Sequence, residues 1–113
     1  MTARYVPERG DIVWFTFDPQ AGREQSGRRP ALVLSPASYN RRTSLALVCP
    51  ITSHVKGYPF EVGLPKESTI GGVILADHLK SADWQTRRAR FAGKVTDSVL
   101  GEVSAKLRPL LGL

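Results

Sequence analysis

Short runs of apolar residues, separated by turn-forming residues, recur along most of the chain and predict strands. The clearest is Asp11–Phe17, which is rich in β-branched and aromatic side chains and ends at Asp18 and Pro19. Similar runs predict strands at residues 31–34, opened by Pro30, at 45–49, closed by Pro50, and at 60–64, 73–76 and 88–95. So many short strands favour a small barrel, with an isolated mixed sheet as the alternative.

The last segment has a different period. Its apolar residues recur at steps of three and four, as one face of a helix requires: Val99, Leu100, Val103, Leu107, Leu110 and Leu111. Thr96 or Asp97 can cap the start of this helix, and Pro109 limits or kinks its end. A short helix is also compatible with residues 38–41. The pattern therefore predicts a mainly β fold with an amphipathic C-terminal helix.

Length and composition favour one domain over residues 1–113. Apolar residues make up 42% of the 113 residues, enough for a core without disulfides. The one cysteine, Cys49, lies in an apolar run and is expected to be a buried packing residue, which fits a reducing compartment. No apolar stretch is long enough to span a membrane and the first residues lack a signal-peptide core, so we expect a cytoplasmic protein without membrane contact.

The chain is strongly basic, with a formal net charge of +6 and an isoelectric point of about 10.0. A small basic domain attracts phosphate backbones or acidic proteins. Metal and cofactor chemistry is not indicated, because His54, His78 and Cys49 fit no CxxC, HxH or HExxH spacing and no phosphate-binding glycine motif is present. A serine–histidine–acid triad stays open, although no GxSxG elbow marks a nucleophile. We therefore expect neither a metal nor a cofactor.

Two polar segments could carry chemistry. Residues 23–30 place three arginines and Glu24 beside a strand, which suits either a phosphate clamp or a solvated charged turn. Thr52 and Ser53 follow Pro50 at another strand end, where hydroxyls serve either a site or a turn. From these features alone, the prediction is a basic β-barrel that binds nucleic acid.

Longer motifs run through nearly the whole chain in a fixed order. They include RYVP from Arg4, GDIVW from Gly10, FDP from Phe17, EQSGRRPALVLSP from Glu24, PIT from Pro50, KGYPFEV from Lys56 and GVILAD from Gly72. With these motifs the chain resembles the MazF/PemK (Kid-like) family of bacterial toxin endoribonucleases. After Trp84 only a basic strand and a closing helix agree.

The resemblance implies an SH3-like barrel that forms a homodimer with an RNA groove between its subunits. It implies cleavage of single-stranded RNA at short sequences without a metal, by attack of the 2′-hydroxyl on the adjacent phosphate. The products would be a 2′,3′-cyclic phosphate and a 5′-hydroxyl. It also implies inhibition by a cognate MazE-like antitoxin, whose acidic disordered tail fills the groove.

Carried over to this chain, the family's catalytic positions are Arg29 and Thr52, with Glu24 in the loop that borders the site. Arg29 suits charge stabilisation, because a guanidinium is always cationic and forked. Thr52 can donate a hydrogen bond to a phosphoryl oxygen. Glu24 is then the expected proton acceptor.

RNA contacts are expected from residues that would line the groove: Phe17, Gln25, Arg28, Asn40, Ser53, Lys56, His78 and Arg87. Phe17 could stack a base or pack in the core, the amide, hydroxyl and imidazole groups could read base edges, and the cations could contact phosphates. His78 departs from the family, which usually has glutamine there. It could read a base, transfer a proton, or have no role.

Two other classes of protein compete with this interpretation. Gyrase-poisoning toxins such as CcdB share the barrel, but they act through a C-terminal Trp-Gly-Ile, whereas this chain ends Leu111-Gly112-Leu113. A non-catalytic RNA-binding barrel is the other rival. The presence of Arg29 and Thr52 favours the nuclease.

Overall fold

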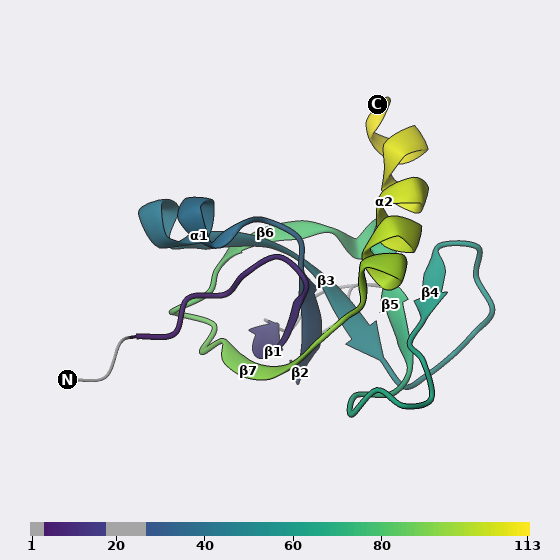
Figure 1. Cartoon of the computed structure of the whole chain (residues 1–113), viewed down its shortest axis with the longest axis horizontal. Coiled ribbons are helices and arrows are strands. Elements are labelled where there is room, and N and C mark those ends of the chain that lie inside the picture. Colours follow the sequence, from purple (N-terminus) through teal and green to yellow (C-terminus); the bar gives the residue numbers. More distant parts are fainter. Residues whose placement is uncertain (1–3, 18–26) are drawn as a thin grey trace.

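The structure is a computed structural model that describes residues 4–17 and 27–113. A strongly curved antiparallel sheet carries α1 and α2 near opposite ends (Figure 1). The strands are β1 (Asp11–Phe17), β2 (Gly27–Val33), β3 (Leu45–Thr52), β4 (Glu61–Gly63), β5 (Val73–Leu75), β6 (Lys80–Asp83) and β7 (Arg90–Lys94). The helices are α1 (Ala37–Thr43), the 3₁₀-helix η1 (Ala76–His78) and α2 (Asp97–Leu111).

The strands follow the order β4-β5-β3-β2-β1-β7, and β6 pairs with β3 as well. All pairings among these strands are antiparallel. In the described part of the chain β6 and β7 do not pair with each other, and residues 84–89 connect them. The predicted barrel is therefore present as a curved sheet that stays open between β6 and β7.

Each face of the sheet covers its own core. The core on the face away from α2, called the inner core, contains Val13, Phe15, Phe17, Ala31, Val33, Ala46, Val48, Ala82 and Trp84. The outer core lies under α2 and contains Ile12, Leu32, Cys49, Ile51, Val62, Ile74, Ala76, Val99 and Val103. Successive residues of a strand point to opposite faces, so β1 supplies Val13 to one core and Ile12 to the other.

Cys49 is confirmed as a buried packing residue of the outer core. Its thiol lies 3.6 Å from the carbonyl oxygen of Ala76, to which it donates. Burial raises the pKa of the thiol to about 12, and the nearby negative charge of Asp77 adds to the shift. The group is therefore a protonated thiol at neutral pH.

Pro30 and Pro50 are predicted from the sequence to mark strand ends, but both lie inside strands. Pro30 is the fourth residue of β2, and Pro50 is the sixth residue of β3. Pairing of β2 with β3 starts at Ala31, so Pro30 has a partner strand on one side alone. Pro50 falls between the end of the β6 pairing at Val48 and the start of the β5 pairing at Ile51. Proline has no backbone N–H to donate, and at each of these two positions the pairing with one neighbouring strand is interrupted.

The predicted strand at Asp11–Phe17 is confirmed, and other boundaries shift. The strand predicted from residue 88 begins at Arg90, because Arg88 has a left-handed φ of 56° in the preceding turn. The strand β6 is not predicted by the sequence pattern, since its sequence KSAD is short and polar. The short helix extends to seven residues, Ala37–Thr43.

The C-terminal helix α2 is confirmed, and its start is the predicted one. Thr96 caps it by accepting a hydrogen bond from the Val99 amide at 3.3 Å. Pro109 neither ends nor limits the helix, which continues to Leu111. It lies in the last turn, where its missing N–H removes one backbone hydrogen bond.

The segment before β1 is held by two carboxylates. Asp11 is buried, accepts from the Tyr5 hydroxyl at 2.6 Å and pairs with the Lys94 ammonium at 2.6 Å. Glu8 accepts from the backbone amides of Arg9 at 2.8 Å and Ala37 at 2.9 Å. The Ala37 amide is the first of α1, so Glu8 caps a helix that has no cap from its own Pro36.

Candidate active site

The predicted catalytic residues Arg29 and Thr52 lie at the same level of the sheet. Ala31 of β2 pairs with Pro50 of β3. Arg29 is two residues before Ala31 and Thr52 is two residues after Pro50, so both lie just past the same end of this antiparallel ladder. Both are an even number of residues from inner-core positions on their strands, so both side chains belong to the inner face. The sheet therefore places half-buried Arg29 and buried Thr52, which are 23 residues apart in sequence, on one face at the same end of the ladder.

Thr52 is held tightly by its neighbours. It is 8% exposed, and its Oγ1 accepts a hydrogen bond from the His54 amide at 3.1 Å. The hydroxyl acts as acceptor there, so its own proton remains to donate. Gly72 adopts a φ of 107°, and a Cβ at that position would lie 2.2 Å from the Thr52 carbonyl oxygen. The backbone at Thr52 is thus fixed by a close approach that glycine alone allows.

The prediction that Phe17 stacks an RNA base is not supported. Its ring is 2% exposed and packs on Phe15, with ring centroids 5.2 Å apart. The ammonium of Lys80 lies 5.8 Å from the centre of the Phe17 ring. Core packing, the other interpretation of this residue, is the one the structure bears out.

Lys80 is a candidate that sequence reasoning missed. It pairs with Val48, an inner-core residue, so its side chain belongs to the same face as Arg29 and Thr52. In the sequence, Lys80 stands in a short polar segment, where no local pattern distinguishes a lysine of a functional site from one that only makes the surface soluble. Its orientation emerges once β6 is paired with β3.

Asn40 is expected from the sequence to read a base, and the structure contradicts this. The side chain is 0% exposed and its amide nitrogen donates to the carbonyl oxygens of Pro7 at 2.8 Å and Ser35 at 3.0 Å. The Ser35 hydroxyl donates to its amide oxygen at 2.6 Å. All of these partners lie within the chain, so Asn40 is a structural residue that ties α1 to the N-terminal segment.

Arg28 has a structural role that the sequence does not indicate. Its guanidinium donates to the Thr16 hydroxyl at 2.9 Å and to the carbonyl oxygens of Arg87 at 3.3 Å and Arg88 at 2.7 Å. Arg87 in turn donates to the Thr16 carbonyl oxygen at 3.2 Å. Partial loss of solvation lowers the pKa of Arg28, and the positive charges of Arg88 and Arg90 lower it further. Arg28 thereby fixes the turn that bridges the open side of the barrel.

The remaining predicted residues are spread over several elements. Ser53 and Lys56 are exposed in the segment after β3, and the Lys56 ammonium lies 5.8 Å from the centre of the Tyr58 ring. His78 is half-buried at the end of η1. Glu24 and Gln25 lie outside the described residues.

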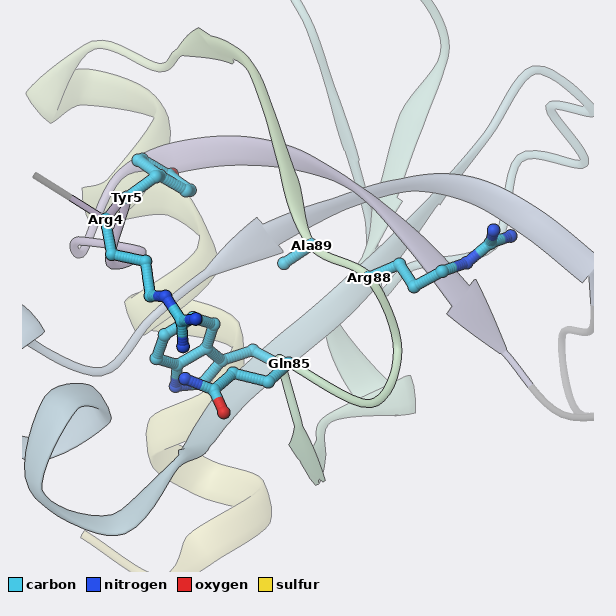
Figure 2. A pocket seen from close by; sticks show the side chains of 6 residues that line it. Arg4, Tyr5, Gln85, Arg88 and Ala89 are labelled. Atoms are coloured by element: carbon cyan, nitrogen blue, oxygen red, sulfur yellow. The ribbon is translucent and has the colours of Figure 1, made fainter. Parts of the chain in front are cut away.

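A cavity of about 350 Å³ opens on another side of the molecule, at the turn after β6 (Figure 2). Its lining residues are Arg4, Tyr5, Trp84, Gln85, Arg88 and Ala89. In Figure 2, Arg4 extends toward Gln85, whereas Arg88 extends in the opposite direction. Neither Arg29 nor Thr52 lines it, so this cavity is separate from the candidate site.

Within residues 4–17 and 27–113, no group of three or more His, Cys, Asp or Glu side chains could hold a metal ion. No helix in this described part is long and apolar enough to cross a membrane. The chemical groups that the inner face offers are a guanidinium, a hydroxyl and an ammonium.

Comparison with known proteins then decides the family. The family model described as PemK-like, MazF-like toxin of type II toxin–antitoxin systems matches residues 8–111. The chain belongs to this family. Within the PemK/MazF family, the endoribonuclease toxin MazF of Escherichia coli K12 is 47% identical over 112 residues, covering 99% of this chain and 100% of that protein. The endoribonuclease PemK of Escherichia coli is 34% identical over 92% of this chain and 81% of PemK.

Solved MazF structures agree with this family in fold. MazF from Deinococcus radiodurans is 56% identical and superimposes with a TM-score of 0.94, covering 97% of this chain and 100% of that one. A MazE–MazF complex from the same organism has a TM-score of 0.89 at 56% identity. The predicted MazF/PemK resemblance and the barrel-like fold with its C-terminal helix are therefore confirmed.

Proposed function

We propose that this chain is an endoribonuclease toxin that cuts single-stranded RNA and is silenced by an antitoxin. The observation that carries the proposal is the placement of Arg29 and Thr52 on the inner face, past the same end of the β2–β3 ladder, in a chain of the PemK/MazF family. Relatives named as endoribonuclease toxins, and MazF structures solved with MazE, support it. The expected site of action is the cytoplasm, and the expected working form is a homodimer.

The reaction we propose is a transesterification within the RNA strand. The 2′-hydroxyl loses its proton and its oxygen attacks the adjacent phosphorus. The bond from phosphorus to the 5′-oxygen then breaks, and that oxygen takes up a proton. The products are a 2′,3′-cyclic phosphate and a 5′-hydroxyl, so no water, metal or redox partner enters the balance.

Arg29 and Thr52 would stabilise the phosphorane. The Arg29 guanidinium offers two parallel N–H donors and a permanent positive charge to the phosphoryl oxygens. The Thr52 hydroxyl adds a donor, because its oxygen already accepts from the His54 amide. Lys80, on the same face, would supply a second positive charge. The proton acceptor would be Glu24, with His78 as the rival.

The test is cleavage of a long single-stranded RNA by the purified protein in the presence of EDTA. We expect cleavage to persist and to leave cyclic-phosphate ends. A 2′-deoxy sugar at the cut position should block cleavage there, because it lacks the attacking oxygen. Cleavage of that substrate at the normal rate would contradict the mechanism, and intact RNA in every arm would contradict the nuclease function.

A further inference from the structure

The outer face of β1 carries an exposed tryptophan on the side opposite the candidate active site. Val13, Phe15 and Phe17 point into the inner core, so Trp14 and Thr16 point outward. Trp14 pairs with Pro30 on one side and with Arg90 on the other. Its side chain is 38% exposed. An indole thus lies on the outer face of the sheet beyond the part that α2 covers.

Arginines surround this indole. Arg90 is its cross-strand neighbour, and Arg28 lies diagonally across β2, opposite Thr16. Arg28 and Arg88 are joined by the hydrogen bond from the Arg28 guanidinium to the Arg88 carbonyl oxygen at 2.7 Å. Desolvation lowers the pKa of Arg28, and the positive charges of Arg88 and Arg90 lower it further, which agrees with the neighbouring positions of these residues.

The backbone holds this cluster of charges in place. Arg88 has a left-handed φ of 56° and Arg28 binds its carbonyl oxygen, so the backbone of the turn that carries the Arg88 side chain is held in place. The register places Thr16, Pro30, Arg28 and Arg90 around Trp14, and none of them is acidic. Three clustered guanidinium groups repel one another, and a bound anion would relieve that repulsion.

We propose that the Trp14 surface, defined as Trp14, Arg28, Arg88 and Arg90, binds a single-stranded segment of the RNA substrate away from the cleaved linkage. A base would stack on the indole, and the neighbouring phosphates would lie at the arginines. This inference rests on the proposed function. It assigns a second RNA contact to the outer face, while Arg29 and Thr52 act on the inner face.

RNA fits this surface better than an acidic peptide does. Stacking requires an exposed ring face, and every base offers one, whereas an anchoring side chain of a peptide requires a recess. The cavity around Trp84 is lined by Arg88 but not by Trp14, so the indole itself does not border it. A strand with one phosphate per nucleotide also matches the three cations more closely than scattered carboxylates would.

The test compares binding of a short and a long RNA to the full-length protein. Oligonucleotides of about six and about twenty nucleotides bracket the roughly 4–16 nucleotide site sizes of single-strand binders. Both carry 2′-fluoro sugars, which cannot attack the phosphate. We expect Trp14→Ala to weaken binding of the long RNA about tenfold and to leave the short RNA unchanged. Arg90→Gln should lower the salt dependence of long-RNA binding by about one charge.

Matched controls are available on α1. Tyr39 is 40% exposed, close to Trp14 at 38%, and Arg42 is an exposed arginine. Tyr39→Ala and Arg42→Gln should bind both RNAs as the wild type does. Trp14→Phe keeps a ring and should retain most of the affinity.

Tryptophan fluorescence gives a direct reading of RNA binding at Trp14, because Trp84, the other tryptophan, is 5% exposed. The long RNA should quench the wild type and leave Trp14→Phe unquenched.

Several outcomes would overturn the inference while the nuclease function stands. One is a wild type that cuts RNA while Trp14→Ala binds the long RNA normally. Another is an equal loss on the short and long RNA, which would assign Trp14 to the catalytic groove or to stability. Quenching by a synthetic acidic peptide, with no effect of RNA, would assign the surface to a protein partner. If the wild type cuts no RNA at all, the proposed function itself fails, and this inference fails with it.

Discussion

At the scale of single residues, two adjacent arginines of β2 have different roles because they point to opposite faces. Arg28 uses its forked donors to hold Thr16 and the turn at Arg87 and Arg88. Arg29 belongs to the inner face, as Thr52 does. The alternation of a strand therefore places Arg28 on the outer face, where it holds the turn, and Arg29 on the inner face with the candidate active site.

Replacing Arg29 tests the catalytic half of this division. We expect Arg29→Ala to lower the single-turnover cleavage rate about 100- to 1,000-fold, the usual loss when one transition-state donor is removed. Arg29→Lys should stay slow, because a point charge lacks the fork. Arg42→Ala, on exposed α1, is the control. A fast Arg29→Lys variant would show that charge alone is sufficient.

Gly72 offers a test of how tightly Thr52 must be held. A Cβ at Gly72 would lie 2.2 Å from the Thr52 carbonyl oxygen, and its φ of 107° disfavours any side chain. Gly72→Ala should therefore displace Thr52, lowering both the melting temperature and the cleavage rate. A Cβ at the neighbouring Gly71 would point into open space, so Gly71→Ala should change neither. Equal behaviour of the two variants would contradict this account.

Residue identity and local order predicted part of the site. The motifs point to Arg29 and Thr52, and the β2–β3 ladder places both past its same end on one face. Phe17 and Asn40 were assigned to RNA from residue type, but both are buried by partners distant in sequence. Burial of this kind depends on tertiary contacts that no local pattern contains.

At the scale of elements, α1 depends on a residue from outside the helix. Pro36 provides no side-chain cap, and Glu8 accepts from the Ala37 amide instead. This hydrogen bond, followed by the one from the Arg9 amide, lowers the pKa of Glu8 below its ordinary value of 4.5. A carboxylate at a helix N-terminus also favours the backbone dipole.

The sign of the resulting pH dependence follows from the lowered pKa. The stabilisation is fully present above the unfolded-state pKa of Glu8 and is lost as the pH falls through its folded-state pKa. We expect Glu8→Ala to lower the free energy of unfolding at pH 7 by about 1 kcal/mol, as loss of a cap does. The difference from wild type should shrink in acid. Urea unfolding at several pH values, with Glu67→Ala as control, measures it; a difference that grows in acid would contradict the assignment.

The elements differ in how far their sequence predicts them. β1 and α2 follow from strong apolar periodicity, and Thr96 from its capping chemistry. β6 was missed because KSAD has no apolar alternation and becomes a strand by pairing with β3. Pro30 and Pro50 looked like strand ends, yet each lies where one ladder is interrupted. Pairing partners, rather than propensity, decide these cases.

At the scale of the whole molecule, the two faces of one curved sheet separate the cores and the functional groups. The inner face carries Arg29, Thr52 and Lys80 near the end of its core. The outer face packs on α2 at one end and presents Trp14 at the other. The opening between β6 and β7 is bridged by the turn that Arg28 holds.

The rate at which the one thiol of the chain is labelled can measure the rate at which the whole structure unfolds. Cys49 is fully buried in the outer core, and a protonated thiol is a poor nucleophile. An aromatic disulfide reagent should therefore label it at the rate at which unfolding exposes it. Val103→Ala, in the same core, should cost about 2 kcal/mol and speed labelling about 30-fold.

Ser104→Ala, one residue along α2 and exposed, should label as slowly as the wild type. Rapid labelling of the wild type would instead reveal a local route to Cys49. If labelling does follow unfolding, a single chromogenic reaction would report the folded lifetime of this protein, and any ligand that binds only the native state would slow labelling by a factor of one plus the ratio of free ligand concentration to its Kd.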